Sequence, residues 1–373
     1  MAAYLDHAAT TPLRPGVLEA MLPFLTDRFG NPSGSHTPAR RAQQALDEAR
    51  EVVAAGLGCL PGEVVFTSGG TEADNLAVLG VRAGRPGPVV CTAADHHAVL
   101  EPTRSVGGRV VPVDRSGRVD LEALDSALDP SVSVVSVILA NNEVGVVQLL
   151  DEVAALVRDR APGAALHTDA VHGVCWLDVA RLAAPCDLVS VSGHKFGGPK
   201  GIGVLVVRSG TPFGPLLLGG SQERGRRPGT QDVAGAAGLA AALAATVASR
   251  SDEVARVGFL RDRLQAGLAS LDGVRLTVPP GTADKVAGTC HVLVPGLDSE
   301  ELLLLLDESG VSASAGSACA SGALEPSHVL LSMGIPPAEA RSAVRFSLGW
   351  STTGDEIDTA LAVMAGVLSQ LRR

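Results

Sequence analysis

Short apolar runs rich in valine alternate with helical patterns through the first two-thirds of the chain. Because these runs carry apolar residues on both faces and helices separate them, they predict a mainly parallel sheet that is covered on each side. Seven strands are expected, at residues 64–67, 89–92, 110–113, 132–139, 165–168, 188–192 and 204–207. Helices are expected at 38–57, 72–81, 121–128 and 151–160. The predicted fold class is therefore α/β.

The last third of the chain has a different pattern. An alanine-rich helical stretch runs from residue 230 to about 269, and shorter segments follow it. These are strands at 274–278, 290–294 and 343–348, a helix at 299–308, and a final helix that opens with a capping box from Thr353 to Glu356. With 373 residues the chain is long enough for two packed domains. We expect a large domain over 15–250 and a smaller α/β domain formed by 1–14 and 251–373.

The charge and the cysteine content exclude several classes of protein. With 30 basic and 40 acidic residues, the formal net charge is −10, which disfavours binding to nucleic acid or to anionic membranes. Six cysteines without a C-x-x-C motif fit neither a disulfide framework nor a metal site, so we expect free thiols, a reducing compartment and no bound metal. The first residues do not resemble a signal peptide, and the uncharged run 233–249 is short for a membrane span. We therefore expect a cytoplasmic protein.

Lysine is rare in this sequence. Among the 30 basic residues, only Lys195, Lys200 and Lys285 are lysines. A position that needs an amine able to lose its proton cannot accept arginine, because the guanidinium group stays charged. Two of the three lysines lie close together after the expected strand 188–192, which directs attention to that segment.

Polar groups follow four of the expected strands. Strand 64–67 leads into a glycine turn at Gly70, which offers free N–H groups to a phosphate at a helix start. Asp169, Lys195 and Asn142 follow three other strands. Each signal is weak alone, since plain tight turns, helix-capping acids and solvated lysines are common. Because ligands bind beyond the carboxyl ends of parallel strands, the four together favour pyridoxal phosphate, whose aldehyde needs a lysine and whose ring needs a carboxylate.

Motifs in order along nearly the whole chain make this interpretation more specific. They are YLDHAATTP at 4–12, FGNPS at 29–33, TSGGTE at 67–72, NNEVG at 141–145, SGHK at 192–195, RPGT at 227–230, GSAC at 316–319 and RFSLG at 345–349. In these motifs the chain resembles the cysteine desulfurases, a branch of the class V aminotransferase group of fold-type I pyridoxal-phosphate enzymes. The segment around Cys319 is similar to the class I, iron–sulfur-assembly type rather than to the histidine-bearing class II type.

The resemblance implies a set of cofactor contacts in a homodimer. Lys195 would form the Schiff base with pyridoxal phosphate, and Asp169 would pair with the pyridinium nitrogen. His96 would stack on the ring, and Asn142 would contact its phenolic oxygen. The phosphate would be held by Gly70, Thr71, Ser192, His194 and, from the partner subunit, Thr230.

The resemblance also implies how the substrate is handled. Asn31 and Arg345 would bind the carboxylate of L-cysteine, the arginine through a two-pronged contact. Cys319, in a stretch of small residues from 312 to 322, would attack the substrate sulfur, leaving L-alanine and a Cys319 persulfide. His96 is expected to take part in catalysis. The persulfide would pass its sulfur to an acceptor protein, for iron–sulfur clusters or for thio-modification.

The chain departs from the family pattern at His172, where the family usually has glutamine. A histidine can still donate a hydrogen bond to the cofactor oxygen, but its charge is expected to add pH sensitivity. Three alternatives stay open: a selenocysteine lyase, another pyridoxal-phosphate enzyme such as an aminotransferase, and a non-catalytic scaffold for sulfur carriers. Cys319 argues against the aminotransferase but not against the lyase, and intact Lys195, Asp169 and Cys319 argue against the scaffold.

Overall fold

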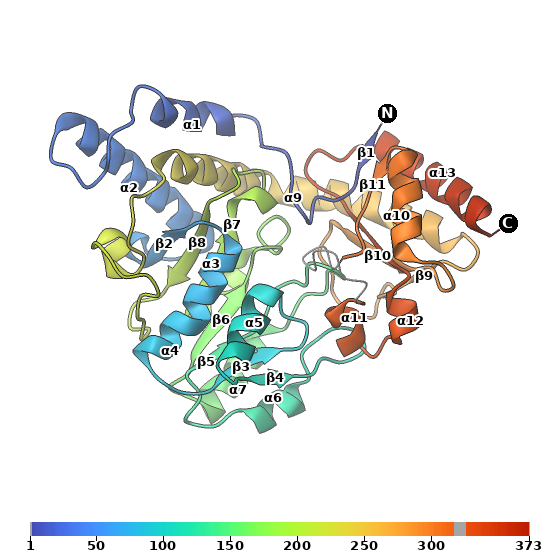
Figure 1. The fold of residues 1–373 in the computed structure, drawn as a ribbon, viewed down its shortest axis with the longest axis horizontal. Helices are drawn as coiled ribbons and strands as arrows, with labels where there is room; N and C mark the ends of the chain where they lie inside the picture. Colours follow the sequence, from blue (N-terminus) through green and yellow to red (C-terminus); the bar gives the residue numbers. More distant parts are fainter. Residues whose placement is uncertain (1, 317–325, 373) are drawn as a thin grey trace.

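A computed structural model describes residues 2–316 and 326–372 (Figure 1). Cys319 therefore lies outside the described residues. The central sheet has seven strands in the order β2-β8-β7-β6-β5-β3-β4, and only β8 runs antiparallel to its neighbours. Its strands are β2 (Val64–Thr67), β3 (Val89–Thr92), β4 (Arg109–Val111), β5 (Val134–Ser136), β6 (Ala165–Asp169), β7 (Leu188–Ser192) and β8 (Gly203–Val207). This confirms the predicted α/β class and its mainly parallel sheet.

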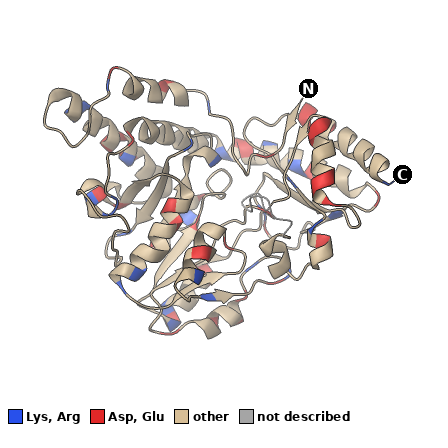
Figure 2. Cartoon of the chain, viewed as in Figure 1, with Lys and Arg blue, Asp and Glu red and all other residues tan. Residues whose placement is uncertain are grey.

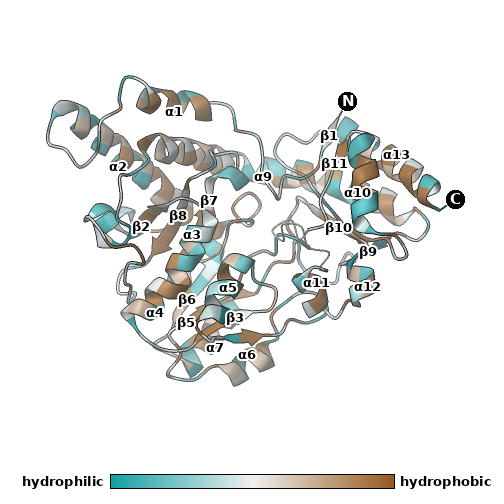
Figure 3. Ribbon diagram, in the orientation of Figure 1, coloured by the Kyte–Doolittle hydropathy of each residue, from teal (hydrophilic) through white to brown (hydrophobic). Residues whose placement is uncertain are grey.

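The central sheet is covered on both faces because its strands are apolar on both sides. Every residue of β6, β7 and β8 is buried. One face packs against α1 (Val17–Leu25), α2 (Thr37–Leu57), α6 (Leu121–Ala127), α7 (Leu150–Arg160), α8 (Val179–Leu182) and the first half of α9 (Val233–Ala269). The other face packs against α3 (Gly70–Asn75), a π-helical turn (Leu76–Gly80), α4 (Val81–Gly84) and α5 (His97–Ser105). In Figure 3 much of the ribbon of these strands has the brown colour of hydrophobic residues.

A smaller unit stands beside the large sheet. It contains an antiparallel sheet of β12 (Ala343–Ser347), β10 (Thr289–Leu293) and β9 (Arg275–Leu276), and a parallel pair of β1 (Ala3–Tyr4) and β11 (Val311–Ser312). Its helices are α10 (Ser299–Glu308), α11 (His328–Ser332), α12 (Pro337–Ala340) and α13 (Gly354–Leu371). The predicted capping box is present at the start of α13, where Thr353 and Glu356 exchange hydrogen bonds.

Helix α9 extends from the large unit into the small one, as Figure 1 shows. Its first half packs on α1 and α2, and its second half packs near β10 and α13. Among the described residues it is the one helix long and apolar enough to cross a membrane, but 56% of its most apolar window is buried inside the protein. Burial of this kind is typical of the core helix of a globular protein. We propose that the two domains divide near the middle of α9, as the sequence suggests.

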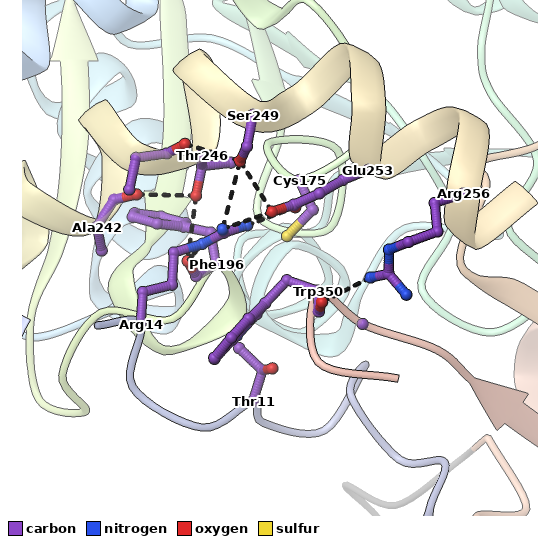
Figure 4. A network of polar contacts seen from close by, with 12 residues as sticks. Thr11, Arg14, Cys175, Phe196, Ala242, Thr246, Ser249, Glu253, Arg256 and Trp350 are labelled. Atoms are coloured by element: carbon purple, nitrogen blue, oxygen red, sulfur yellow. Dashed lines mark hydrogen bonds and ion pairs between the residues drawn. The ribbon is translucent and has the colours of Figure 1, made fainter. Parts of the chain in front are cut away.

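Arg14 joins the two units at this division (Figure 4). Both terminal nitrogens of its guanidinium group donate hydrogen bonds to the carboxylate of Glu253 on α9, at 2.6 and 2.7 Å. Its Nε donates a hydrogen bond to the carbonyl oxygen of Phe196 at 3.0 Å. The same group lies over the ring of Trp350. Because Phe196 follows Lys195 directly, these contacts fix the turn that carries the rare lysine.

Candidate active site

A cavity of about 360 Å³ opens between the two units, beyond the carboxyl ends of β6 and β7. Ten of the residues proposed from the sequence line it: Gly70, Thr71, His96, Asn142, Asp169, His172, Ser192, His194, Lys195 and Arg345. Asp169 is the last residue of β6, Ser192 is the last of β7, and Gly70 opens α3. The placement follows from the parallel arrangement, which brings the ends of separate strands to one edge of the sheet.

Lys195 lies at the end of a short 3-10 turn, Gly193–Lys195, that follows β7 directly. The turn directs its side chain toward the N-terminal segment, where Nζ donates hydrogen bonds to the carbonyl oxygens of Ala8 and Ala9, the latter at 2.9 Å. The other two lysines are absent from the cavity lining. The cavity therefore holds one amine, half-buried and close to the carboxylate at the end of β6.

Asp169 is buried, and its Oδ1 accepts a hydrogen bond from the backbone N–H of Val171 at 2.8 Å. Burial raises the pKa of this carboxyl group, while the Val171 N–H and the charge of Lys195 act in the opposite direction. A cation placed against Asp169 would hold it in the ionised form. The site thus has an acid whose charge depends on what binds beside it.

Three histidines of the cavity are neutral imidazoles. Burial, followed by the charge of Lys195, lowers the pKa of His96 and of His194 to about 4. Burial, followed by the charges of Arg345 and Lys195, lowers the pKa of His172 to about 3. This lowered pKa argues against the expectation that His172 adds pH sensitivity, because a histidine with such a pKa does not change charge near neutral pH. Its Nε2 lies 3.2 Å from the hydroxyl of Thr289.

Arg345 reaches the cavity from β12 of the small unit and is almost fully buried. One terminal nitrogen donates to Asp6 Oδ1 at 2.8 Å, and the other donates to the backbone carbonyl oxygen of Asn142 at 3.0 Å. Its Nε is buried and has no hydrogen-bond partner among the described residues. This leaves donors of the guanidinium group available for an anionic ligand in the cavity.

Comparison with known proteins identifies the group to which this arrangement belongs. The aminotransferase class-V family model matches residues 3–360. A cysteine desulfurase of Cereibacter sphaeroides is 44% identical, over 99% of this chain and 96% of the relative. The chain belongs to the cysteine desulfurase family. A solved NifS-like protein has a TM-score of 0.92 and 34% identity over 99% of this chain and 100% of its own, which confirms the fold-type I architecture. A structure of SspA in complex with cysteine has a TM-score of 0.79 and 30% identity over 94% of this chain and 100% of its own.

The cysteine desulfurase family depends on pyridoxal phosphate, and the described residues fit this group. Gly70 is the first residue of α3, and a Cβ added to it would lie 2.9 Å from a Val171 side-chain carbon, so only glycine leaves the helix start open. One lysine and one strand-end carboxylate share the cavity. Ligand atoms of Asp74, His96 and Asp169 lie within 4.8 Å of one another, as in a metal site. The nearby ammonium of Lys195, however, disfavours a metal cation there.

Two of the sequence-proposed residues do not reach the cavity of the single chain. Asn31 is exposed, and its side-chain oxygen accepts a hydrogen bond from the backbone N–H of Ser33. Thr230 is exposed in the segment before α9. The lining also includes residues that sequence reasoning missed, chiefly Asp74, Ala8 and Ala9. The backbone carbonyl oxygens of Ala8 and Ala9 accept the hydrogen bonds from Lys195. Asp74 gave only a weak signal, an acid inside the helix that starts at the glycine turn.

Proposed function

We propose that this cysteine desulfurase converts L-cysteine to L-alanine and leaves the sulfur on Cys319 as a persulfide. The observation that carries the proposal is the convergence of Lys195, Asp169 and Arg345, from both units, on one cavity. A lysine, an acid and an arginine are the groups that an aldehyde cofactor and an amino-acid carboxylate require. The related structure in complex with cysteine supports the same substrate.

The residues of the cavity divide between parts of pyridoxal phosphate. Lys195 would hold its aldehyde carbon, and Asp169 would hold its ring nitrogen in the protonated form. His96 would cover the ring, while Asn142 and the neutral His172 would face its phenolic oxygen. When bound, the cofactor supplies an electron sink that weakens bonds around the substrate's α-carbon. The phosphate would be held at the start of α3 by Gly70 and Thr71, together with Ser192 and His194.

The chain's own groups bind the substrate and accept its sulfur. Arg345 would bind the carboxylate, using the guanidinium donors that Asp6 and Asn142 leave free. The Cys319 thiolate then attacks the substrate sulfur, the carbon–sulfur bond breaks, and a sulfur–sulfur bond forms on Cys319. The β-carbon of the substrate takes up a proton, and the product leaves as alanine. One sulfur atom is transferred to Cys319, and no external oxidant is needed.

The environments of the other cysteines support Cys319 as the nucleophile. The described residues contain five free cysteines, and none of them lines the cavity. Burial raises the pKa of Cys59 to about 11 and that of the others to about 12, namely Cys91, Cys175, Cys186 and Cys290. A thiol with such a pKa is almost entirely protonated at neutral pH and attacks slowly.

The active unit we propose is a homodimer in which the partner subunit completes the phosphate site. Thr230 is exposed in the single chain, as expected for a residue that serves the other subunit. Leu18, Leu22 and Leu25 form an exposed apolar row at helical spacing on α1, between 51% and 61% exposed. Mixing inactive Lys195→Ala with Thr230→Ala subunits should regenerate one native site per mixed dimer, whereas a Thr230 that acts within its own subunit would give no recovery.

The proposed setting is the cytoplasm, with a protein as sulfur acceptor. Acidic and basic residues are interspersed over the ribbon (Figure 2), and the net charge of −10 argues against nucleic acid or an anionic membrane as partner. Trapping the acceptor protein on the Cys319 persulfide would identify it, and would show whether the sulfur serves iron–sulfur clusters or thio-modification. A selenocysteine lyase remains the second candidate, because its cavity would need the same groups.

One experiment tests the function directly. The protein loaded with pyridoxal phosphate is mixed with L-cysteine without reductant, and alanine and the peptide masses are measured. We expect alanine and a gain of one sulfur atom on the peptide that contains Cys319. Cys319→Ser should bind the cofactor but release almost no alanine. Turnover of cysteine by Cys319→Ser near the wild-type rate would exclude the persulfide route and favour the lyase.

A further inference from the structure

Asp74 is a fully buried carboxyl group that the proposed reaction does not use. It lies on α3, lines the floor of the cavity, and is 1% exposed. One of its oxygens and one of Asp169 belong to a group of atoms within 4.8 Å of one another. Two buried carboxylates this close repel strongly, so only one of them can be ionised at low cost.

A chain of neutral hydrogen bonds ends at Asp74. His167 on β6 lies with Nδ1 2.8 Å from the Ser136 hydroxyl and Nε2 2.9 Å from the Ser190 hydroxyl, and Ser190 in turn bonds to the Asp74 carboxyl group. If Ser190 donates to Asp74, then Ser190 accepts from His167 Nε2–H and Ser136 donates to Nδ1. This direction satisfies both ring nitrogens with a neutral imidazole.

Among the ion pairs of the described residues, Asp74 is paired with no lysine or arginine and lies only near His167. Its Oδ1 is buried without a hydrogen-bond partner, and it lies 3.6 Å from His167 Nε2. Burial lowers the pKa of His167 to about 3, so the imidazole is neutral. Burial and the neighbouring Asp169 raise the pKa of Asp74, and Asp95 adds to the repulsion. Asp169, in contrast, has a backbone N–H donor and the Lys195 charge to stabilise its ionised form.

We propose that Asp74 is kept as a neutral carboxylic acid, so that Asp169 alone carries the negative charge that holds the cofactor's ring nitrogen. The inference rests on the proposed function and names a positioning residue for it. Ser136, His167 and Ser190 fix the carboxyl group in place. Because Asp74 is neutral, the single negative charge of the pair Asp74 and Asp169 lies on Asp169, at the end of β6.

The protonation states are tested on wild-type apoprotein, which needs no variant and no turnover. Infrared difference spectra with carbon-13-labelled aspartate should show a protonated carboxyl band at about pH 8.5, where Asp95, whose pKa burial raises to about 7, is ionised. Nitrogen-15 spectra of histidine should show His167 as a neutral imidazole. A His167 imidazolium signal would overturn the proposal, because it would mean that an ionised Asp74 pairs with a charged histidine.

Matched variants then assign the charge to one acid of the pair. Asp74→Asn replaces a neutral acid with a neutral amide of the same shape, so its affinity for pyridoxal phosphate should stay within about threefold of wild type, and it should lose the protonated carboxyl band. Asp169→Asn removes the charge itself and should weaken binding by about tenfold or more. Equal losses in the two variants would overturn the proposal. Affinity and spectra are read without cysteine, so the result is independent of whether desulfurase activity is confirmed.

Discussion

Glu143 accepts a hydrogen bond from the hydroxyl of Ser327, across 184 residues of sequence. The same carboxyl group lies against Gly316, where an added Cβ would be 3.1 Å from Glu143 Oε2. Gly316 and Ser327 stand on either side of the segment that carries Cys319 in the sequence. One buried side chain from the NNEVG motif therefore fixes both flanks of that segment.

Glu143→Ala should slow persulfide formation on Cys319 by about tenfold, because both flanks lose a buried hydrogen-bond partner or a packing contact worth roughly 1 kcal/mol each. Cofactor binding should stay unchanged, since Glu143 does not line the cavity. Glu143→Gln keeps an acceptor for Ser327 and should restore most of the rate. Single-turnover mass spectrometry measures the effect, and a wild-type rate in Glu143→Ala would show that these contacts do not position Cys319.

Borohydride reduction of the loaded protein should place the cofactor on Lys195. Lys285 is the informative competitor, because burial lowers its pKa and could make its amine reactive. Its Nζ, however, donates to the Val278 carbonyl oxygen, outside the cavity. Peptide mass spectrometry locates the reduced adduct, and Lys195→Ala should fold but bind no cofactor covalently. An adduct on Lys285 or Lys200 would contradict the assignment.

Local patterns were sufficient to predict the sheet and much of the site. The strands at 64–67, 89–92 and 188–192 were predicted to the residue, since buried strands of a parallel sheet are apolar on both faces. The acid and lysine at the ends of β6 and β7 were found because strand ends of a parallel sheet share one edge. The expected strand 132–139 is shorter in the structure, at Val134–Ser136, although the chain beyond it keeps backbone bonds to β6.

Contacts between distant segments could not be read from local patterns. Arg345 bonds to Asp6 across 339 residues, and no local feature of either motif indicates that pairing. The antiparallel direction of β8 depends on how the chain returns across the sheet, which periodicity does not encode. The lowered pKa of His172, which argues against the expected pH sensitivity, could not be read locally for a similar reason, because it arises from burial between elements far apart in sequence.

His172→Gln should leave the shape of the pH profile unchanged between about pH 5 and 8. With a pKa of about 3, His172 is neutral throughout this range, so replacing it with a neutral amide removes no titrating charge. The ratio of variant to wild-type activity, measured at each pH with the cofactor bound, should be constant. A ratio that bends near the usual histidine pKa would show that His172 titrates during turnover.

Seven histidines, four of them buried and three half-buried, have lowered pKa values: His7, His96, His167, His172, His194, His291 and His328. A lowered pKa means that the unfolded chain binds protons that the folded chain does not. The stability that these groups contribute is fully present above pH 6.5, which is about the pKa of histidine in the unfolded chain. It is lost as the pH falls toward the lower pKa values of the folded chain. The raised pKa of Asp95, about 7, acts in the opposite direction, since the folded chain binds that proton more tightly.

His291 lies outside the cavity, so the effect of one lowered histidine pKa on stability can be measured there without disturbing the site. It lies on β10, its Nδ1 is 2.7 Å from the Thr277 hydroxyl, and its Nε2 is buried without a hydrogen-bond partner among the described residues. Burial lowers its pKa to about 3, so it is neutral in the folded protein above this pH. In His291→Gln, unfolding free energy should fall less steeply from pH 6.5 to 4, by up to about 1.4 kcal/mol per pH unit. Urea titrations of apoprotein at several pH values measure this slope, and equal slopes for variant and wild type would show that His291 does not take up a proton on unfolding.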